Sequence, residues 1–146
     1  MLPQDAYVRG VADNTKGADV MSVGFGRRLN GVEFWGAGYE IIVDIGRGGR
    51  IVRVRKAWPE LIPIGEYDLV EVREAVKKLA AGEGALYHGN RGEITGAKVV
   101  YYASPVAQEY AQPCYYFECR DPEDGQEFYG VIEAIPSGEG SEAERR

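Results

Sequence analysis

Residues 39–58 read YEIIVDIGRGGRIVRVRKAW, and this stretch says more about the fold than any other part of the chain. Its first half alternates, so that one face carries only apolar side chains: Tyr39, Ile41, Val43 and Ile45. The opposite face carries Glu40 and Asp44, which we expect to pair across the strands with Arg53 and Arg55 of the returning half. The GRGG segment between the halves tolerates the positive φ angles of a tight turn. These residues therefore predict an antiparallel β-hairpin.

Further segments on both sides of this hairpin have the composition of strands. They are rich in β-branched and aromatic residues and are bounded by Gly, Pro, Asn or Asp. The chain contains 20 glycines and 10 tyrosines, which fits short strands joined by turns. The strands expected in this way are 20–28, 32–35, 85–88, 94–104, 112–120 and 126–135.

One segment, 68–81, has the pattern of an amphipathic helix. Asp68 is a favourable N-cap and Gly82 is a natural stop. Apolar residues recur between them at helical spacing: Leu69, Val72, Ala75, Val76 and Leu79. We therefore predict an α+β protein with antiparallel sheet, in one sheet or two tandem small units, and with this helix packed on a sheet face.

The expected organisation is one domain with two loosely attached ends. With 146 residues the chain has the usual length of a single domain. Polar, glycine-containing sequence at both ends predicts less order there. We expect a flexible arm at 1–18, a domain at 19–136 with two possible sub-repeats (19–62 and 63–136), and a disordered tail at 137–146.

Charge and hydropathy exclude two classes of partner. The net charge of −6 argues against a general nucleic-acid binder, which needs a basic surface to replace counterions. The charge is uneven, because residues 27–56 hold seven basic and three acidic side chains whereas residues 103–146 hold three and ten. No apolar run reaches the length of about 20 residues that a membrane-spanning helix needs.

The sequence contains no recognisable catalytic or metal-binding motif. The glycine pairs at 24–26 and 46–49 lack the rest of a dinucleotide fingerprint and do not lead into a helix. His88 is the only histidine, and we interpret it as a turn residue. Cys114 and Cys119 lie five residues apart on one expected strand, on opposite faces, and so should not pair with each other. We expect no metal and no cofactor.

Aromatic residues in the second half of the chain suggest a different type of site. Tyr101, Tyr116 and Glu118 lie on two expected strands and could line a small-molecule cavity. Burial of Glu118 among apolar neighbours would raise the pKa of its carboxyl group. The alternative is an aromatic core with one carboxylate at its edge.

The run RLNGVEFWGAG at 28–38, followed by IIVDIGRGGRIV at 41–52, resembles PepSY-type and related peptidase-propeptide domains. The helix 68–81 with strands after it is similar to a unit of that family. The resemblance implies tandem small sheets, each covered by a helix, in a non-catalytic bacterial module. It also implies regulation of a protease or signalling protein outside the cytoplasm if the chain is a fragment of a longer protein; otherwise we expect a cytoplasmic location.

We therefore expect a protein-binding or regulatory module rather than an enzyme, with another protein or a peptide as its partner. An exposed strand edge, at 39–45 or 112–120, could accept an extended peptide, and Arg53 and Arg55 are candidate contact residues. Two alternatives are a small-molecule-binding or cyclase-like protein built around Tyr101, Tyr116 and Glu118, and an assembly subunit that uses the arm 1–18. The oligomeric state is open.

Overall fold

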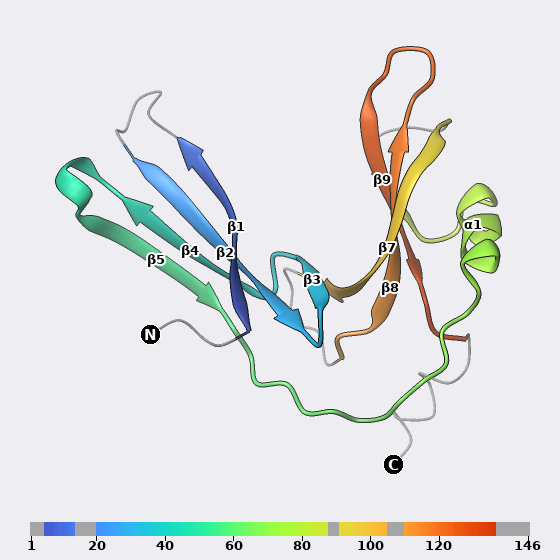
Figure 1. Ribbon diagram of the computed structural model, residues 1–146, viewed down its shortest axis with the longest axis horizontal. Coiled ribbons are helices and arrows are strands. Elements are labelled where there is room, and N and C mark those ends of the chain that lie inside the picture. The colour runs from blue at the N-terminus through green and yellow to red at the C-terminus, as the bar shows by residue number, and fades with distance from the viewer. Residues whose placement is uncertain (1–4, 14–19, 88–90, 105–109, 137–146) are drawn as a thin grey trace. The chain divides into compact units, whose positions relative to one another are not determined.

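The computed structural model describes residues 5–13, 20–87, 91–104 and 110–136, and the chain divides into two compact units (Figure 1). Unit 1 comprises Met1–Ile62 with Ala103–Glu109, and unit 2 comprises Pro63–Tyr102 with Tyr110–Arg146. Each unit contains antiparallel strands of its own.

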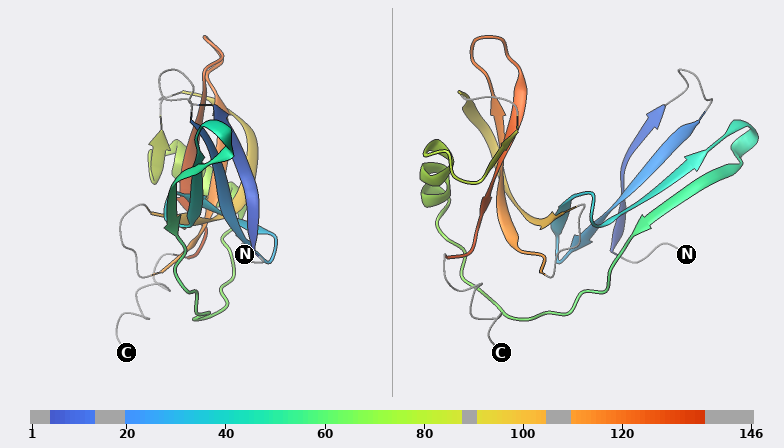
Figure 2. Two further views of the ribbon diagram at one scale, coloured as in Figure 1. Left: turned by 90° about the vertical axis from the view of Figure 1, so that its left-hand side faces the viewer. Right: turned by 180° about the vertical axis from the view of Figure 1, so that it is seen from behind.

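Unit 1 is built from five strands in its described residues: β1 (Ala6–Asp13), β2 (Met21–Leu29), β3 (Val32–Gly36), β4 (Glu40–Ile45) and β5 (Ile51–Ala57). Four of them form an antiparallel sheet in the order β1-β2-β4-β5 (Figure 2). The fifth, β3, pairs with the last two residues of β2. In this hairpin Asn30 and Gly31 have φ angles of 49° and 82°, which suits the right-handed twist of the flanking strands.

The predicted 39–58 hairpin is confirmed. β4 and β5 are antiparallel neighbours, and a 3-10 turn, Arg47–Gly49, joins them, with positive φ at Gly48 and Gly49. One predicted charge pair forms, between Asp44 and Arg53. Glu40 instead lies 3.7 Å from Arg9, because its cross-strand neighbour on β5 is Ala57 and not an arginine.

Arg27 on β2 ties several segments of unit 1 together. Its side chain is only 11% exposed, and its Nε donates to the Asp5 carboxylate over 2.6 Å. A second nitrogen donates to the Pro59 carbonyl over 2.7 Å. Three aromatic rings surround the guanidinium at 5.2 to 5.7 Å: Phe34, Tyr39 and Trp58.

Unit 2 combines four described strands with one helix. The strands are β6 (Ala85–Tyr87), β7 (Glu93–Ala103), β8 (Pro113–Arg120) and β9 (Glu127–Glu133), in the order β7-β8-β9-β6. The helix, α1 (Val72–Ala80), lies against one face of this sheet (Figure 1). Between them is an apolar core of Ala75, Phe117, Cys119, Phe128 and Ile132.

The helix begins four residues later than predicted. Residues before it are held extended, because the Val70 N–H donates to the Ala134 carbonyl over 2.8 Å and the Tyr115 hydroxyl donates to the Val70 carbonyl over 2.7 Å. Asp68 is therefore not the N-cap; Glu71 takes that position without a side-chain hydrogen bond. Leu69 and Val72 stay more than 40% exposed, while Ala75, Val76 and Leu79 pack as predicted.

The predicted α+β class is wrong, because the described residues are mostly strand. They contain nine strands and a single nine-residue α-helix. Two features shift the balance: the helix is shorter than expected, and residues 6–13, placed in a flexible arm, form β1 against β2. Unit 1 has no α-helix over its sheet in the described part of the chain. The tail 137–146 lies outside the described residues.

Candidate functional site

β5 forms an open border of unit 1. It pairs with β4 and with no other strand among the described residues. Six of its seven residues are exposed, and it is therefore a row of backbone donors and acceptors available to a further strand. The two edges named from the sequence are both wrong, because β4 lies between β2 and β5, and β8 lies between β7 and β9.

The two faces of β5 differ in chemistry. Val54 continues a row of valines across the sheet, and we call this side the valine face: Val11, Val23, Val43 and Val54 lie on it in register. Arg53 and Arg55 lie on the other side, opposite Asp44 and Ile42 of β4, and we call it the arginine face. Lys56 lies on the valine face, opposite Ile41. β5 thus alternates apolar and basic side chains along an open edge.

Asp44 is the buried anchor of the arginine face. It is 2% exposed, accepts a hydrogen bond from the Ser22 hydroxyl over 2.6 Å and accepts another from Arg53 Nε over 2.5 Å. These two hydrogen bonds, the one from Ser22 first, hold the pKa of the Asp44 carboxyl below its ordinary 3.8, against the opposing effect of burial. The carboxylate is therefore ionised at neutral pH and orients Arg53.

The ladder between β4 and β5 shifts its register next to this cluster. The shift falls between Asp44 and Ile45, where Arg53 and Ile51 are the successive partners on β5. Such a bulge re-aims side chains at an edge. Ile51 and Val52 beside it are 62% and 50% exposed. The first residues of β5 therefore present the exposed side chains of Ile51 and Val52 next to Arg53, which is bound to the Asp44 carboxylate.

In unit 2, two of the three predicted aromatic-site residues come together and the third does not. Tyr116 and Glu118 share the face of β8 that points away from α1, since Phe117 and Cys119 between and after them belong to the core. Tyr101 pairs with Pro113 and, by register, projects to the opposite face. Tyr101 therefore cannot act with Tyr116 and Glu118 at one surface of this sheet.

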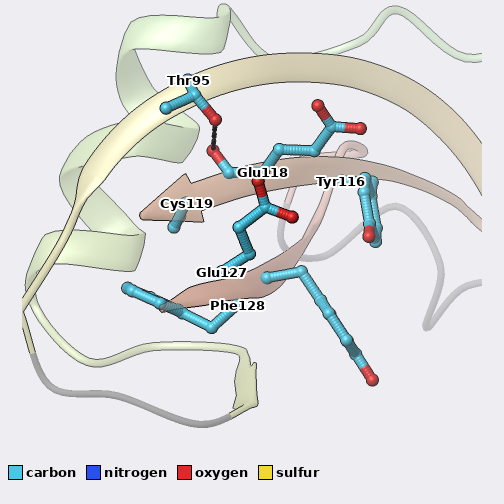
Figure 3. A pocket seen from close by; sticks show the side chains of 7 residues that line it. Thr95, Tyr116, Glu118, Cys119, Glu127 and Phe128 are labelled. Carbon is cyan, nitrogen blue, oxygen red and sulfur yellow. Dashed lines mark hydrogen bonds between the residues drawn. The ribbon is translucent and has the colours of Figure 1, made fainter. Parts of the chain in front are cut away.

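Tyr116 and Glu118 line a surface hollow of about 340 Å³ (Figure 3). Tyr116 stacks on Tyr129 with ring centroids 5.5 Å apart, and Lys98 Nζ lies 5.3 Å from the Tyr116 ring. Tyr129 also lines the hollow, together with Thr95, Cys119, Glu127 and Phe128. Glu118 is exposed, so the burial expected for its carboxylate from the sequence is not found.

Both cysteines are buried free thiols, as their spacing predicts. Burial, and secondarily the negative charge of Glu133, raises the pKa of the Cys114 thiol to about 11. Burial also raises the pKa of Cys119. Both shifts lower the fraction of thiolate, which is the reactive form of a cysteine.

The described part of the chain meets neither the requirements of a metal-ligand cluster nor those of a membrane-spanning helix. No three His, Cys, Asp or Glu side chains within it are grouped so as to hold a metal ion. None of the helices found there is long and apolar enough to cross a membrane. His88, the only histidine, lies outside the described residues.

No family model matches the chain, and no curated protein is similar to it. The likeness to PepSY-type domains therefore rests on the residues of the 28–52 stretch and on the helix alone.

The sequence pattern identifies Arg53 and Arg55 as candidate contact residues, but it does not show that their strand lies at the open border of the sheet. Alternation in 50–58 identifies a strand with Arg53 and Arg55 on one side. Its position at the border follows from the strand order β1-β2-β4-β5, in which β5 and β1 are the two outermost described strands, and this order depends on pairing between segments distant in the sequence. The sequence offers one hint of this position. Ile51, Val52 and Val54 are apolar although they belong to a strand that is exposed to solvent.

Proposed function

We propose that the chain is a non-enzymatic protein-binding module that accepts an extended segment of its partner along the open edge of β5. A single observation carries the proposal: among the described strands β5 pairs only with β4, and exposed apolar side chains lie along this open edge. An added strand would satisfy the free backbone groups, and its side chains would provide the specificity. The resemblance to PepSY-type domains adds the expectation that the partner is a protease or signalling protein.

The charge of β5 favours an acidic partner segment. Arg55 and Lys56 are exposed, and Arg53 keeps 63% of its side chain exposed despite its pairing with Asp44. Opposite charges that face each other across strands stabilise by about 0.2–1 kcal/mol per pair, and like charges destabilise by similar amounts. A segment with carboxylates on the arginine face therefore binds better than a basic one.

The same charges oppose edge-to-edge pairing of two β5 strands. In an antiparallel pair centred on Val54, Arg53 of one copy faces Arg55 of the other. Moving the centre to Arg55 or to Lys56 places identical cations opposite each other. Edge charges of this kind are a known protection against self-aggregation, and they leave the edge selective for a different, acidic strand.

The alternation of β5 defines the sequence pattern of that strand. Residues directly opposite Arg53 and Arg55 lie on the arginine face, and we expect Asp or Glu there. Residues opposite Val52 and Val54 lie on the valine face, and we expect Val, Ile or Leu there. The preferred ligand is an extended run in which acidic and β-branched residues alternate.

A labelled hexapeptide of alternating Glu and Val, flanked by Gly and Ser, tests this in a fluorescence-anisotropy titration of the full chain. We expect saturable binding that weakens as salt increases, and binding of the Lys–Val analogue weaker by at least about tenfold. Two further peptides carry N-methyl groups on the Glu or on the Val amides. Strand addition predicts that one methylation pattern abolishes binding and the other preserves it, because only alternate amides face β5.

Two variants of the chain test whether the peptide binds at the edge of β5. Arg55→Glu should weaken binding by at least about tenfold, by exchanging an attraction for a repulsion. Arg73→Glu is the matched control: it makes the same change on an exposed position of α1 and should leave binding unchanged. Equal binding of both N-methylated peptides, or an equal effect of the two variants, would contradict strand addition at β5.

A second candidate, a small-molecule site at Tyr116 and Glu118, is favoured by one observation. The hollow beside them has a volume of about 340 Å³, within the range of roughly 300–1,000 Å³ that ligand sites occupy. Its carboxylates would prefer a cationic ligand. A screen of small organic amines by NMR, with Glu118→Gln as the comparison, tests this candidate; the absence of Glu118-dependent shifts would rule it out.

A further inference from the structure

A row of four valines runs straight across the sheet of unit 1. Val11 of β1 pairs with Val23 of β2, Val23 with Val43 of β4, and Val43 with Val54 of β5. Residues at the same register position on neighbouring strands point to the same face. The row therefore forms a continuous apolar ridge at right angles to the strands.

Most neighbouring positions of the valine face are also apolar; the exceptions at its two borders are Lys56, opposite Ile41, and Asp13, opposite Met21. On one side of the ridge, Phe25 pairs with Val8 and Ile41. On the other side, Met21 pairs with Ile45. Six side chains on this face or at the bulge beside it are between 40% and 62% exposed: Val8, Val11, Met21, Ile51, Val52 and Val54.

The two ends of the valine row are uncovered in unit 1, with Val11 61% and Val54 56% exposed, whereas Ile41 on the same face is only 6% exposed. The unit has strands and one 3-10 turn in its described residues, but no α-helix. The stretches outside the described ranges are short or polar, and none contains more than two large apolar residues. A sheet with one apolar face is stable in water when a second layer packs on it.

We propose that the second layer is the same valine face of a second copy of the chain. The row is self-complementary, because it is all valine and the strand order β1-β2-β4-β5 has its centre between β2 and β4. A two-fold axis parallel to the strands at that centre places Val11 over Val54 of the other copy and Val23 over Val43. Both contacts occur twice, as a symmetric dimer requires.

The rows of Phe25 and Met21, on either side of the valine row, are compatible with this two-fold axis. The same axis places Met21 over Ile45 of the other copy, and Phe25 over Ile41, which is only 6% exposed, so that apolar side chains face each other in both rows. Lys56 comes over Val8 at the border, where its stem can lie on the apolar surface while its ammonium group reaches water. The axis brings no two like charges of these rows together.

The area is sufficient for a specific dimer. Six roughly half-exposed aliphatic side chains and their partly buried neighbours would hide on the order of 600 Å² per copy, or about 1,200 Å² in total, which is the lower bound of standard interfaces. Two sheets packed in this way lie about 10 Å apart. The edge of β5 stays open, so this dimer is independent of the peptide-binding proposal.

Sedimentation of the full chain over a range of concentrations tests the proposal. We expect a species of twice the 16.1 kDa chain mass at micromolar concentration. Val11→Glu and Val54→Lys should each raise the dimer dissociation constant at least about tenfold, since each places a charge in an apolar contact. Val72→Glu, at a valine of α1 that is 44% exposed, should leave the constant unchanged.

Combining the two substitutions in one chain is the decisive measurement. Within a chain, positions 11 and 54 are three strand spacings, about 14 Å, apart and cannot form an ion pair. Across the proposed axis they face each other, so Val11→Glu with Val54→Lys should restore dimerisation to within about threefold of the parent. A monomeric parent at all concentrations, or a double variant weaker than both single ones with native circular dichroism, would overturn the proposal.

Discussion

Arg53 Nε lies 2.5 Å from Asp44 Oδ2, and this bond joins the open strand β5 to β4 beside the bulge. The two partners differ greatly in exposure, since Asp44 is 2% exposed and the Arg53 side chain 63% exposed. The buried Asp44 carboxylate therefore positions an exposed guanidinium, that of Arg53, on the border strand. It fixes Arg53 in place and leaves Arg55 and Lys56 to provide most of the net charge at this edge.

Replacing Asp44 by Asn should destabilise unit 1 in a pH-dependent manner. Because the folded-state pKa of Asp44 is lowered, its contribution to the free energy of unfolding is fully present above the ordinary pKa of 3.8 and is lost as the pH falls through the folded-state value. Urea unfolding at neutral pH should show the variant as less stable. The difference between parent and variant should shrink in strong acid; a difference that grew with falling pH would refute this assignment.

Among the arginines of unit 1, the largely buried Arg27 should contribute most to the free energy of unfolding. Arg27→Ala removes a paired, largely buried guanidinium from Asp5, Pro59 and three rings, and we expect a loss of at least about 2 kcal/mol in the free energy of unfolding. Arg27→Lys should recover only part of this loss, because an ammonium lacks the planar guanidinium fork that donates in its plane while it stacks on the rings. Lys77→Ala, which removes an exposed pair with Glu74, serves as the control and should lose less than about 0.5 kcal/mol.

Tyr115→Phe tests why the helix starts late. The hydroxyl donates to the Val70 carbonyl over 2.7 Å and so fastens the extended segment before α1. Its removal should lower the free energy of unfolding by about 1 kcal/mol. Hydrogen exchange should also become faster at the Val70 amide, which bonds to Ala134. Unchanged exchange at that amide would mean that other contacts hold the segment.

The thiol of Cys114 should be inert in the folded chain. With a pKa of about 11 rather than 9, its thiolate fraction at pH 8 is about 100-fold lower than in the unfolded chain. We expect reaction with an aromatic disulfide reagent to be slow in buffer and fast in concentrated urea. Rapid labelling of Cys114 in the native chain would contradict the burial that the structure assigns to it.

Local pattern was sufficient to predict much of the fold. The alternation at 39–45 and 51–57 and the glycines at 46–49 specify the hairpin without reference to other residues, and it forms. The spacing of Ala75, Val76 and Leu79 likewise identified the helix face that packs. These features depend on side chains a few residues apart, where periodicity is informative.

Three features of the structure could not be predicted, because each depends on a contact with residues distant in the sequence. Residues 6–13 contain Gly10 and little periodicity, and they become a strand because β2 offers them an edge. Asp68 is a favourable N-cap residue type, but the hydrogen bond from the Val70 N–H to Ala134 and the one from the Tyr115 hydroxyl to the Val70 carbonyl keep that segment extended. Tyr101 was grouped with Tyr116 because both are aromatic, and only the β7–β8 register separates their faces.

The most direct test of the central claim is amide hydrogen exchange along β5, followed by NMR, with and without the Glu–Val hexapeptide. Strand addition predicts slower exchange at alternate β5 amides between Ile51 and Ala57, those that face away from β4, and little change in unit 2. Protection that is absent from β5 in the bound state, or confined to the hollow at Tyr116 and Glu118, would contradict the account.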